Sequence, residues 1–309
     1  MALAVAPAAA ADDAGETIVV TATRAPQPAG DTPSPVAVVK GQDLRDAKAL
    51  DEALREDPSF AAFRRSSSLV ADPSSQGVNL RGVGPSGVSR ALVLEDGVPA
   101  SDGFGGWVYW DSVPRLSLQR VEIAPGASSA LYGSAALGGV VQLVSRPIDD
   151  RAEIELQGGS FGTFDGALSL GKRTDALSAA LDAEGLTTQG YGVVASPGPV
   201  DHDASSRHAS ARLRLEAPVG DFTASLRAGA FDEDEDGGTL FTTAAARQAD
   251  VALGLAGRGL EAHLFTRWSQ FDQQRGRVLP DRSAATLAAT QSAPADDEGG
   301  SVLWRPLTG

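Results

Sequence analysis

Residues Gly82 to Gly87 spell GVGPSG, which satisfies the G-x-G-x-x-G pattern of a dinucleotide-binding turn. In such a turn a helix follows the glycines, so that its backbone N–H groups and its dipole meet the pyrophosphate. Here the chain continues with VSRALVLEDGVP, which alternates and is rich in valine, and this pattern predicts a strand. We therefore interpret the run as a glycine-rich hairpin loop between NLRG and RALVLEDG rather than a phosphate-binding turn.

Few other residues have the types and spacing of a reactive centre. The chain has 3 histidines and no cysteine, and His202 and His208 lack the spacing of metal ligands. The run DEDEDG begins like an EF-hand loop, but Thr243 stands where the bidentate glutamate is needed, so we expect a solvated acidic loop that binds Ca²⁺ at most weakly. No G-x-S-x-G motif supports a serine nucleophile. The sequence predicts no catalytic residue, no metal site, no cofactor and no enzyme.

The overall charge narrows the choice of partners. The 309 residues include 26 Lys and Arg against 40 Asp and Glu, a formal net charge of -14, and nucleic-acid binders instead concentrate basic residues on one face. The chain contains no run of 18 apolar residues, so the sequence predicts no membrane-spanning helix. Strands that cross a membrane alternate between apolar and polar residues, however, and leave only a weak hydropathy signal. The absence of cysteine suits passage through an oxidising periplasm. The composition therefore argues against nucleic acid and leaves a membrane open.

The first half of the chain mixes short strand and helix patterns. PVAVVKG predicts a strand, and Gln42 to Glu56 predict a helix with Leu44, Leu50 and Leu54 on one face. Asp57-Pro58 should end this helix, because proline disfavours helical geometry in the residue before it. ALVLEDGVP and QRVEIAPG follow as strand-like runs. We expect a compact α+β domain here.

After Arg151 the helical pattern gives way to segments with a period of two, which predict antiparallel strands. These segments are EIELQGG, TFDGALSLGK, DALSAALDAEG, RHASARLRLEA, DFTASLRAGAF, DVALGLAG, LEAHLFTRWSQF and GSVLWRP. Tight links (KRTD, APVG and AGRG) alternate with long polar ones, which are Thr187–Ser206, Asp232–Arg247 and Asp272–Gly299. This asymmetry is typical of an outer-membrane barrel. A soluble secreted β-sandwich binding module would show the same alternation, and it stays an alternative.

Two segments predict either binding or ordinary packing. The cluster Phe104, Trp107, Tyr109 and Trp110, among glycines, fits a loop that stacks a ligand as well as it fits buried packing. ETIVVTAT, residues 16–23, lies between flexible stretches, and such a segment can add as a strand to the sheet edge of another protein or form an edge strand of its own domain. Residues 1–11, MALAVAPAAAA, fit the remnant of a signal peptide or an alanine-rich tail.

Taken in order, several segments resemble the TonB-dependent outer-membrane receptors. They are ETIVVTATR, VNLRGVGPSG, RALVLEDGVP and VEIAPGASSALYGSAALGGVVQLVSRP. The resemblance implies an α+β plug domain followed by antiparallel transmembrane β-barrel strands, with about eight of an expected 22 strands present. It divides the chain into a signal-peptide remnant (1–11), a TonB box and linker (12–30), a plug (31–148) and the N-terminal portion of the barrel (149–309). Since the strands are few and the chain ends in RPLTG without a terminal aromatic strand, we expect a fragment or a truncated reading frame.

The resemblance also implies site residues. TonB would pair with the box, at Thr17, Ile18, Val19, Val20, Thr21 and Ala22. The ligand would contact the apex loops, at Gly84, Pro85, Ser86, Phe104, Trp107 and Tyr109. Where the family usually has R-G-P this chain has Pro125-Gly126-Ala127, so Arg81 is the candidate for the arginine that latches the plug to the barrel.

The implied function is TonB-dependent active uptake across the bacterial outer membrane. The expected ligand is large and scarce, a ferric siderophore first and cobalamin second. The expected partners are TonB, that ligand and outer-membrane lipid, and no nucleic acid. A signalling receptor of the same family is the alternative, but such receptors usually carry an extra periplasmic domain before the box, where this chain has only about fifteen residues.

Overall fold

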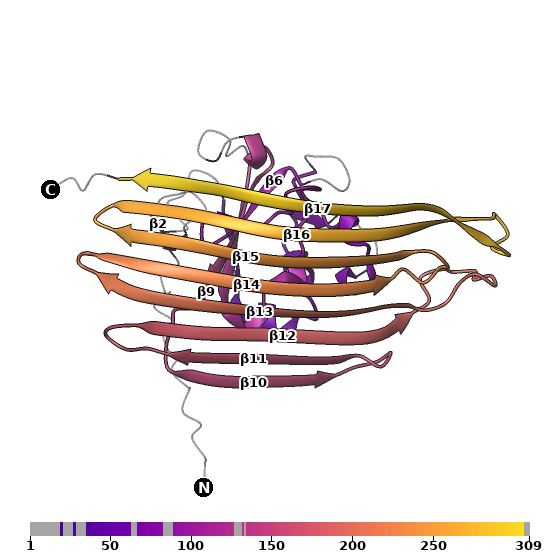
Figure 1. Ribbon diagram of the computed structural model, residues 1–309, viewed down its shortest axis with the longest axis horizontal. Coiled ribbons are helices and arrows are strands. Elements are labelled where there is room, and N and C mark those ends of the chain that lie inside the picture. Colours follow the sequence, from indigo (N-terminus) through magenta and orange to yellow (C-terminus); the bar gives the residue numbers. More distant parts are fainter. Residues whose placement is uncertain are drawn as a thin grey trace, which may run out of the picture.

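The chain forms two layers, an N-terminal domain and a large sheet that covers it (Figure 1). The computed structural model describes residues 19–20, 27–28, 35–62, 67–82, 89–126, 132 and 134–305. Within these ranges, no helix is both long and apolar enough to cross a membrane. The strands of the large sheet run side by side across the view, with the N-terminal domain behind them.

The N-terminal domain is built on a five-stranded sheet of order β3-β8-β9-β6-β7. These strands are β3 (Ala37–Lys40), β6 (Ala91–Glu95), β7 (Val98–Pro99), β8 (Leu118–Pro125) and β9 (Gly139–Ser145). A second pair joins β4 (Phe60–Ala62) to β5 (Val78–Leu80), and β1 (Val19–Val20) pairs with β2 (Gln27–Pro28). Short 3₁₀ turns connect them: η2 (Ser68–Val70), η3 (Pro73–Ser75), η4 (Trp110–Ser112), η5 (Arg115–Ser117) and η6 (Ser134–Ala136). The α+β architecture expected for this half of the chain is confirmed.

The single helix predicted over Gln42 to Glu56 is wrong in one respect. The structure has α1 (Gly41–Asp46) and α2 (Leu50–Leu54), separated by residues 47–49, of which Ala47 has an extended backbone at φ -79 and ψ 148. The interruption leaves the Ala47 carbonyl outside the helical hydrogen-bond pattern, and the guanidinium of Arg115 donates to it at 2.5 Å. A tertiary contact thus overrides a helical periodicity that is local.

The hairpin predicted around the glycine run is also wrong. Strand β5 pairs with β4, whereas β6 pairs with β7 and β9, so the strands on either side of the run belong to different sheets. The hairpin lies one segment later, where Asp96 and Gly97 join β6 to β7 with φ values of 46 and 82. Two central residues with positive φ are the geometry of a type I′ turn, which Asp-Gly favours.

An apolar core fills the space between the five-stranded sheet and the helices. Its residues are Leu44, Leu50, Ala53, Leu54, Phe60, Val78, Leu80, Ala91, Val93, Val108, Trp110, Val113, Leu118, Val121, Ile123, Val141 and Leu143. Trp110 is 1% exposed and meets the ring of Phe60 edge to face, with centroids 5.9 Å apart. The alternating residues of β8 and β9 supply the sheet side of this core. The N-terminal domain therefore has a core of its own.

The large sheet, which we call the wall, contains eight antiparallel strands in sequence order. They are β10 (Arg151–Gly158), β11 (Phe164–Lys172), β12 (Ser178–Tyr191), β13 (Ala204–Val219), β14 (Phe222–Asp236), β15 (Thr243–Gly257), β16 (Leu260–Val278) and β17 (Ala285–Trp304). Each pairs with the next along the chain. The eight predicted strand segments fall one on each of these strands.

In the wall, the face that packs against the N-terminal domain is polar and the exposed face is apolar, which is the reverse of a β-sandwich. Leu213 is 39% exposed, whereas its neighbours Arg212 and Arg214 are buried against the N-terminal domain. Large apolar residues are exposed along the other strands as well: Ile154, Leu156, Leu181, Leu253, Leu264, Trp268 and Val302. A sandwich buries its apolar face between two sheets. Here the polar face is covered and the apolar face is bare, as in a strand wall that faces lipid.

The long polar links are shorter than the sequence predicts. The strands on both sides, β12 to β17, extend into them, so that the links reduce to residues 192–203, 237–242 and 279–284. The acidic run 232–236, expected as a solvated loop, is the end of β14. Its outward Asp232 and Asp234 pair with Arg247 and Arg207 on the adjacent strands, while Glu233 and Glu235 face inward and are buried. Cross-strand charge pairs stabilise a strand that lacks apolar alternation.

Candidate functional site

Arg115 joins the N-terminal domain to the wall through a buried ion-pair cluster. Its Nε lies 2.6 Å from Glu184 on β12, and its Nη2 lies 2.6 Å from Asp165 on β11. The backbone N–H of Arg115 also donates to Glu184, at 2.7 Å. With the bond to the Ala47 carbonyl, these contacts engage each of the three guanidinium nitrogens. Such a charge-assisted network fixes both the position and the orientation of the domain.

The position of Arg115 follows from its local sequence. Pro114 directly precedes η5, which is one 3₁₀ turn long, and the fixed φ of proline restricts the backbone that leads into it. Burial alone would lower the pKa of Arg115, but the carboxylates of Glu184 and Asp165 outweigh it and hold the pKa above its usual value. The guanidinium therefore stays charged, and removal of its partners would leave a buried cation.

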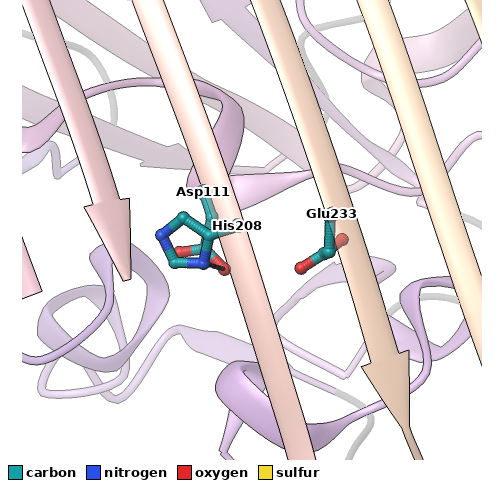
Figure 2. A group of neighbouring side chains, drawn as sticks. All are labelled: Asp111, His208 and Glu233. Carbon is teal, nitrogen blue, oxygen red and sulfur yellow. Dashed lines mark ion pairs between the residues drawn. The ribbon is translucent and has the colours of Figure 1, made fainter. Parts of the chain in front are cut away.

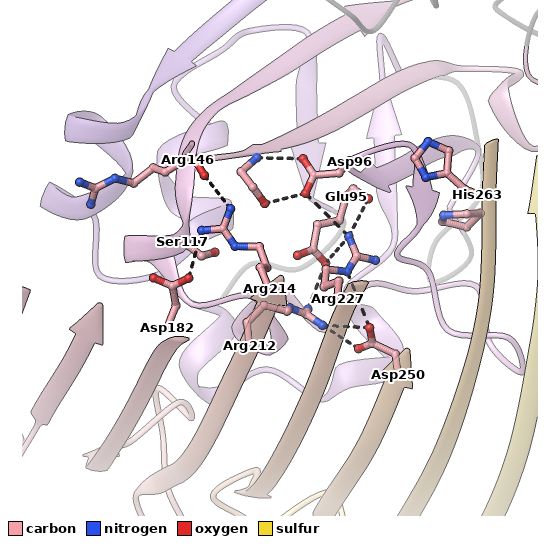
Figure 3. Close-up of polar contacts among 12 residues, drawn as sticks. Glu95, Asp96, Ser117, Arg146, Asp182, Arg212, Arg214, Arg227, Asp250 and His263 are labelled. Carbon is pink, nitrogen blue, oxygen red and sulfur yellow. Dashed lines mark hydrogen bonds and ion pairs between the residues drawn. The ribbon is translucent and has the colours of Figure 1, made fainter. Parts of the chain in front are cut away.

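A second set of contacts runs in the reverse direction, from wall arginines to the β6–β7 hairpin of the domain (Figure 3). Arg212 on β13 lies 3.0 Å from the carboxylate of Glu95, and Arg227 on β14 donates to the Glu95 carbonyl at 2.8 Å. Arg267 on β16 donates to the carbonyl of Pro99 at 2.5 Å. The wall thus holds the hairpin largely through main-chain oxygens.

Acidic residues of the wall orient these arginines. Asp250 on β15 lies 2.7 Å from Arg212, and Asp182 on β12 lies 3.2 Å from Arg214. Arg214 in turn donates to the carbonyl of Arg146, at the end of the N-terminal domain, at 2.6 Å. Because each arginine is paired within the wall, its contact with the domain is only part of what stabilises its charge.

Gly97 lets the hairpin tip approach the wall closely. A Cβ at this position would lie 3.2 Å from Nε2 of His263 on β16, and the positive φ already disfavours other residues. Asp96 beside it accepts from the backbone N–H and the hydroxyl of Ser145, at 3.0 and 2.6 Å. The tip is therefore held to β9 on one side and lies against the wall on the other.

Aromatic rings form an apolar patch in this contact. The rings of Trp107 and Phe271 lie 5.1 Å apart between centroids, and those of Tyr109 and Phe231 lie 5.7 Å apart. Burial raises the pKa of Tyr109 far above its ordinary value, so its hydroxyl stays neutral. Ala244, Ala246 and Ala293 complete the patch. It joins the loop before η4 to strands β14, β15, β16 and β17.

Near the long-link end of the wall, an open pocket of about 520 Å³ is lined by polar residues. Ser206 and Gln273, which line it, bond to the Leu69 carbonyl and the Asp72 carboxylate of the N-terminal domain. The pocket lining comes from strands β12 to β17. Segment 67–76 therefore contacts the wall beside this pocket.

The structure describes only some of the residues that the sequence predicts to contact ligand or TonB. Thr17, Ile18, Thr21, Ala22 and the run Gly84, Pro85 and Ser86 lie outside the described residues. Val19 and Val20 pair with Gln27–Pro28 as β1 and β2. Trp107 and Tyr109 belong to the buried aromatic patch, 6% and 2% exposed, whereas Phe104 beside them is 53% exposed. Of the three aromatic residues, Phe104 is thus the one whose ring is open to solvent.

Arg81, the predicted latch, is exposed and has a φ of 55. Its guanidinium makes no ion pair with any residue in the described part of the chain, and its latch role stays a prediction. Sequence reasoning missed Arg115 and the wall arginines. For the wall arginines a signal was present, because charged residues at alternate positions of a membrane strand face the interior. The structure also brings His208 beside Asp111 and Glu233, which no sequence spacing indicated.

Comparisons with known proteins agree with this architecture. Residues 28–140 match the family described as the TonB-dependent Receptor Plug Domain. A vitamin B12 transporter BtuB of Vibrio cholerae is 30% identical over 200 residues, 61% of this chain and 30% of that protein. One from Photobacterium profundum is 28% identical over 160 residues, 50% of this chain and 25% of its own length. The chain thus spans between a quarter and a third of the length of these relatives, which are named as transporters.

Among solved structures, the pyoverdine outer membrane receptor FpvA from Pseudomonas aeruginosa PAO1, bound to pyoverdine, superposes with a TM-score of 0.69. The superposition covers 94% of this chain and 46% of that one, at 17% sequence identity. At this identity the likeness establishes the fold. The N-terminal domain has the fold of the plug, and the wall corresponds to part of the barrel.

Proposed function

We propose that this chain is part of a TonB-dependent receptor of the bacterial outer membrane and serves the active uptake of a large, scarce ligand. In this proposal the plug closes the barrel at rest, and TonB displaces it when ligand has bound. The alternative of a soluble β-sandwich loses its support with the bare apolar face of the wall.

The observation that carries the proposal is the polar contact between plug and wall. Arg115, Arg212 and Arg227 make ion pairs and hydrogen bonds across it, and the aromatic patch is the apolar cluster that the described residues form there. Water can replace polar contacts one at a time, at a small net cost for each. A plug held in this way can move without losing its own core.

We propose that TonB pairs with residues 17–22 as an added strand. Within this segment Val19 and Val20 pair only with Gln27–Pro28 among the described residues, in a ladder of two residues. So short a ladder is weak, because isolated two-stranded pairs are marginally stable in water. A partner strand could therefore replace β2 at little cost.

The relatives bear on the ligand class. The two curated relatives compared above are vitamin B12 transporters, 28% and 30% identical to this chain over the matched residues. The pyoverdine receptor FpvA is 17% identical, so its likeness supports the fold and not the ligand. We therefore favour the cobalamin class over the ferric siderophore class, with Gly84, Pro85, Ser86 and Phe104 as the plug residues proposed to contact ligand.

The proposal is tested by uptake of radiolabelled cyanocobalamin and of a ferric catecholate siderophore in cells that lack their own receptors. We expect cobalamin uptake that depends on TonB and is abolished by Val20→Pro, because proline removes a backbone donor from the added strand. Asp31→Pro, at the junction of the linker and the plug and two residues before Pro33, is the matched control and should leave uptake unchanged. Equal uptake with and without TonB would overturn the proposal. Siderophore uptake alone would reverse the choice of ligand class.

A further inference from the structure

Three side chains from separate parts of the chain meet between plug and wall, apart from the contacts that dock the plug (Figure 2). His208 on β13 and Glu233 on β14 are directly paired in the sheet register, and both face inward. Asp111 reaches them from the 3₁₀ turn η4 of the plug. The cluster thus joins two neighbouring strands of the wall to one turn of the plug.

The distances in this cluster suit a shared cation better than direct hydrogen bonds. One ligand atom from each residue lies within 4.8 Å of the other two. Nδ1 of His208 and Oδ2 of Asp111 are 3.8 Å apart, too far for a hydrogen bond. Two ligands that each lie about 2.1 Å from one metal ion are separated by up to roughly 4.2 Å. A small rotation of a carboxylate would bring all three within that limit.

A second observation concerns the buried imidazole. The side chain of His208 is 3% exposed, and its Nε2 has no hydrogen-bond partner among the described residues. The side chain of Asp111 is 8% exposed. Buried polar atoms are nearly always satisfied, so a buried imidazole whose Nε2 has no partner and whose Nδ1 lies 3.8 Å from the nearest paired carboxylate points to a missing ligand.

We propose that Asp111, His208 and Glu233 bind a divalent transition-metal cation of the zinc class. One imidazole nitrogen and two carboxylates form a ligand set that such cations accept, whereas an all-oxygen set would favour calcium or magnesium. The cation offsets the two buried negative charges. It also links η4 of the plug to strands β13 and β14, at the level of the aromatic patch.

The competing account is a protonated His208 that pairs with the same carboxylates and with Asp165, which lies close enough to interact with it electrostatically. The two accounts differ in metal content. A protonated imidazole needs no cation, and added metal would not bind at this cluster.

The test uses the detergent-solubilised protein, freed of metal with a chelator and titrated with Zn²⁺. We expect one tight site per chain, and Co²⁺ at the same site should give visible absorption typical of a low coordination number. His208→Gln and Asp111→Asn should each weaken this site by more than the roughly 10- to 100-fold that loss of an outer partner costs. The two variants alter the wall and the plug separately, so a folding defect in one does not decide the result.

His202→Gln is the matched control. His202 also pairs with a carboxylate, Asp236 at 2.7 Å, but its side chain is 46% exposed and it belongs to the surface. The tight site should survive this substitution. Zn²⁺ binding that is equal in wild type and His208→Gln, or a loss that is as large in His202→Gln, would overturn the proposal. Because the readout is metal binding, it is independent of whether the receptor transports cobalamin.

Discussion

The core of the plug and its contact with the wall use opposite kinds of residue. Within the core, Trp110, Val121 and Leu143 are packed against other apolar side chains and are almost fully buried. At the contact, Arg115 and Arg212 are buried as deeply, but their neighbours are carboxylates and main-chain carbonyls. Two surfaces with the same burial thus differ completely in chemistry.

The difference shows which boundary of the molecule can open. An apolar core that is exposed to water loses its stabilisation in proportion to the area exposed. A polar contact that is opened exchanges its bonds for bonds to water, so its net cost is smaller. The plug should therefore separate from the wall before it unfolds, and substitutions in the two regions should have distinct signatures.

The largest effect should come from the core. Trp110→Ala removes a fully buried ring, and we expect it to lower the free energy of plug unfolding by about 3–5 kcal/mol. Hydrogen exchange of the β8 and β9 amides measures this directly. Trp268→Ala on the apolar outer face is the matched control and should leave plug exchange unchanged, since Trp268 is 44% exposed. Equal effects of the two substitutions would contradict the separate plug core.

The next effect should come from Arg115. Arg115→Ala leaves Glu184 and Asp165 buried without a cation, and we expect docking to weaken by about 3 kcal/mol, the lower end for a broken buried pair, because water can enter the contact. Pore conductance in planar bilayers and protease cleavage of the plug should both rise, while exchange at β8 and β9 should not.

Two variants sharpen this result. Arg207→Ala breaks an exposed pair with Asp234 and should change docking little. Arg115→Met combined with Glu184→Gln and Asp165→Asn removes every charge of the cluster and should recover most of the loss. If the charge-free variant is as leaky as Arg115→Ala, the cluster acts through its shape and not its charge.

Arg227→Met should have a smaller effect, about 1.5 kcal/mol, because it removes a charged donor from the Glu95 carbonyl while other arginines still hold the hairpin. A double-mutant cycle with Glu95→Gln measures the coupling through the Glu95 carboxylate, where Arg227 lies 3.5 Å away. Arg212 lies nearer to that carboxylate, so coupling between Arg212→Met and Glu95→Gln should be larger. A larger coupling energy for Arg227 than for Arg212 would show that Arg227 is the main partner of the Glu95 carboxylate.

The smallest effect is expected for Arg81→Ala. Its side chain is exposed, and an exposed charge contributes less than about 1 kcal/mol. The predicted latch would still loosen the plug measurably, with conductance between wild type and Arg115→Ala. If Arg81→Ala conducts as strongly as Arg115→Ala, the two arginines contribute equally to docking. If its conductance equals that of the wild type, Arg81 does not latch the plug.

The sequence predicts the elements better than the contacts between them. Period-two alternation located all eight wall strands, because side chains of a strand alternate between its faces. Alternation places Arg212 on the polar face of its strand but does not say which plug residue it contacts, and Arg115 lies in a turn outside the strands, so neither docking contact could be predicted. The break at Ala47 was missed for the same reason, since its cause is a bond from Arg115, distant in sequence. His208 and Glu233 meet through strand register, which depends on turn geometry.

Strand β3 lies at the edge of the five-stranded sheet, and among the described strands it pairs with β8 alone. It is also the first strand of this sheet along the chain, and only the short β1–β2 pair precedes it among the described strands. A force applied at the N-terminus would therefore reach β3 first and peel it from β8, breaking its hydrogen bonds one after another. Peeling needs less force than shearing a whole ladder at once, and it leaves β8, β9 and β6 paired. The plug is thus mechanically weakest at its entry, and its first strand can yield while the remainder of its sheet stays folded.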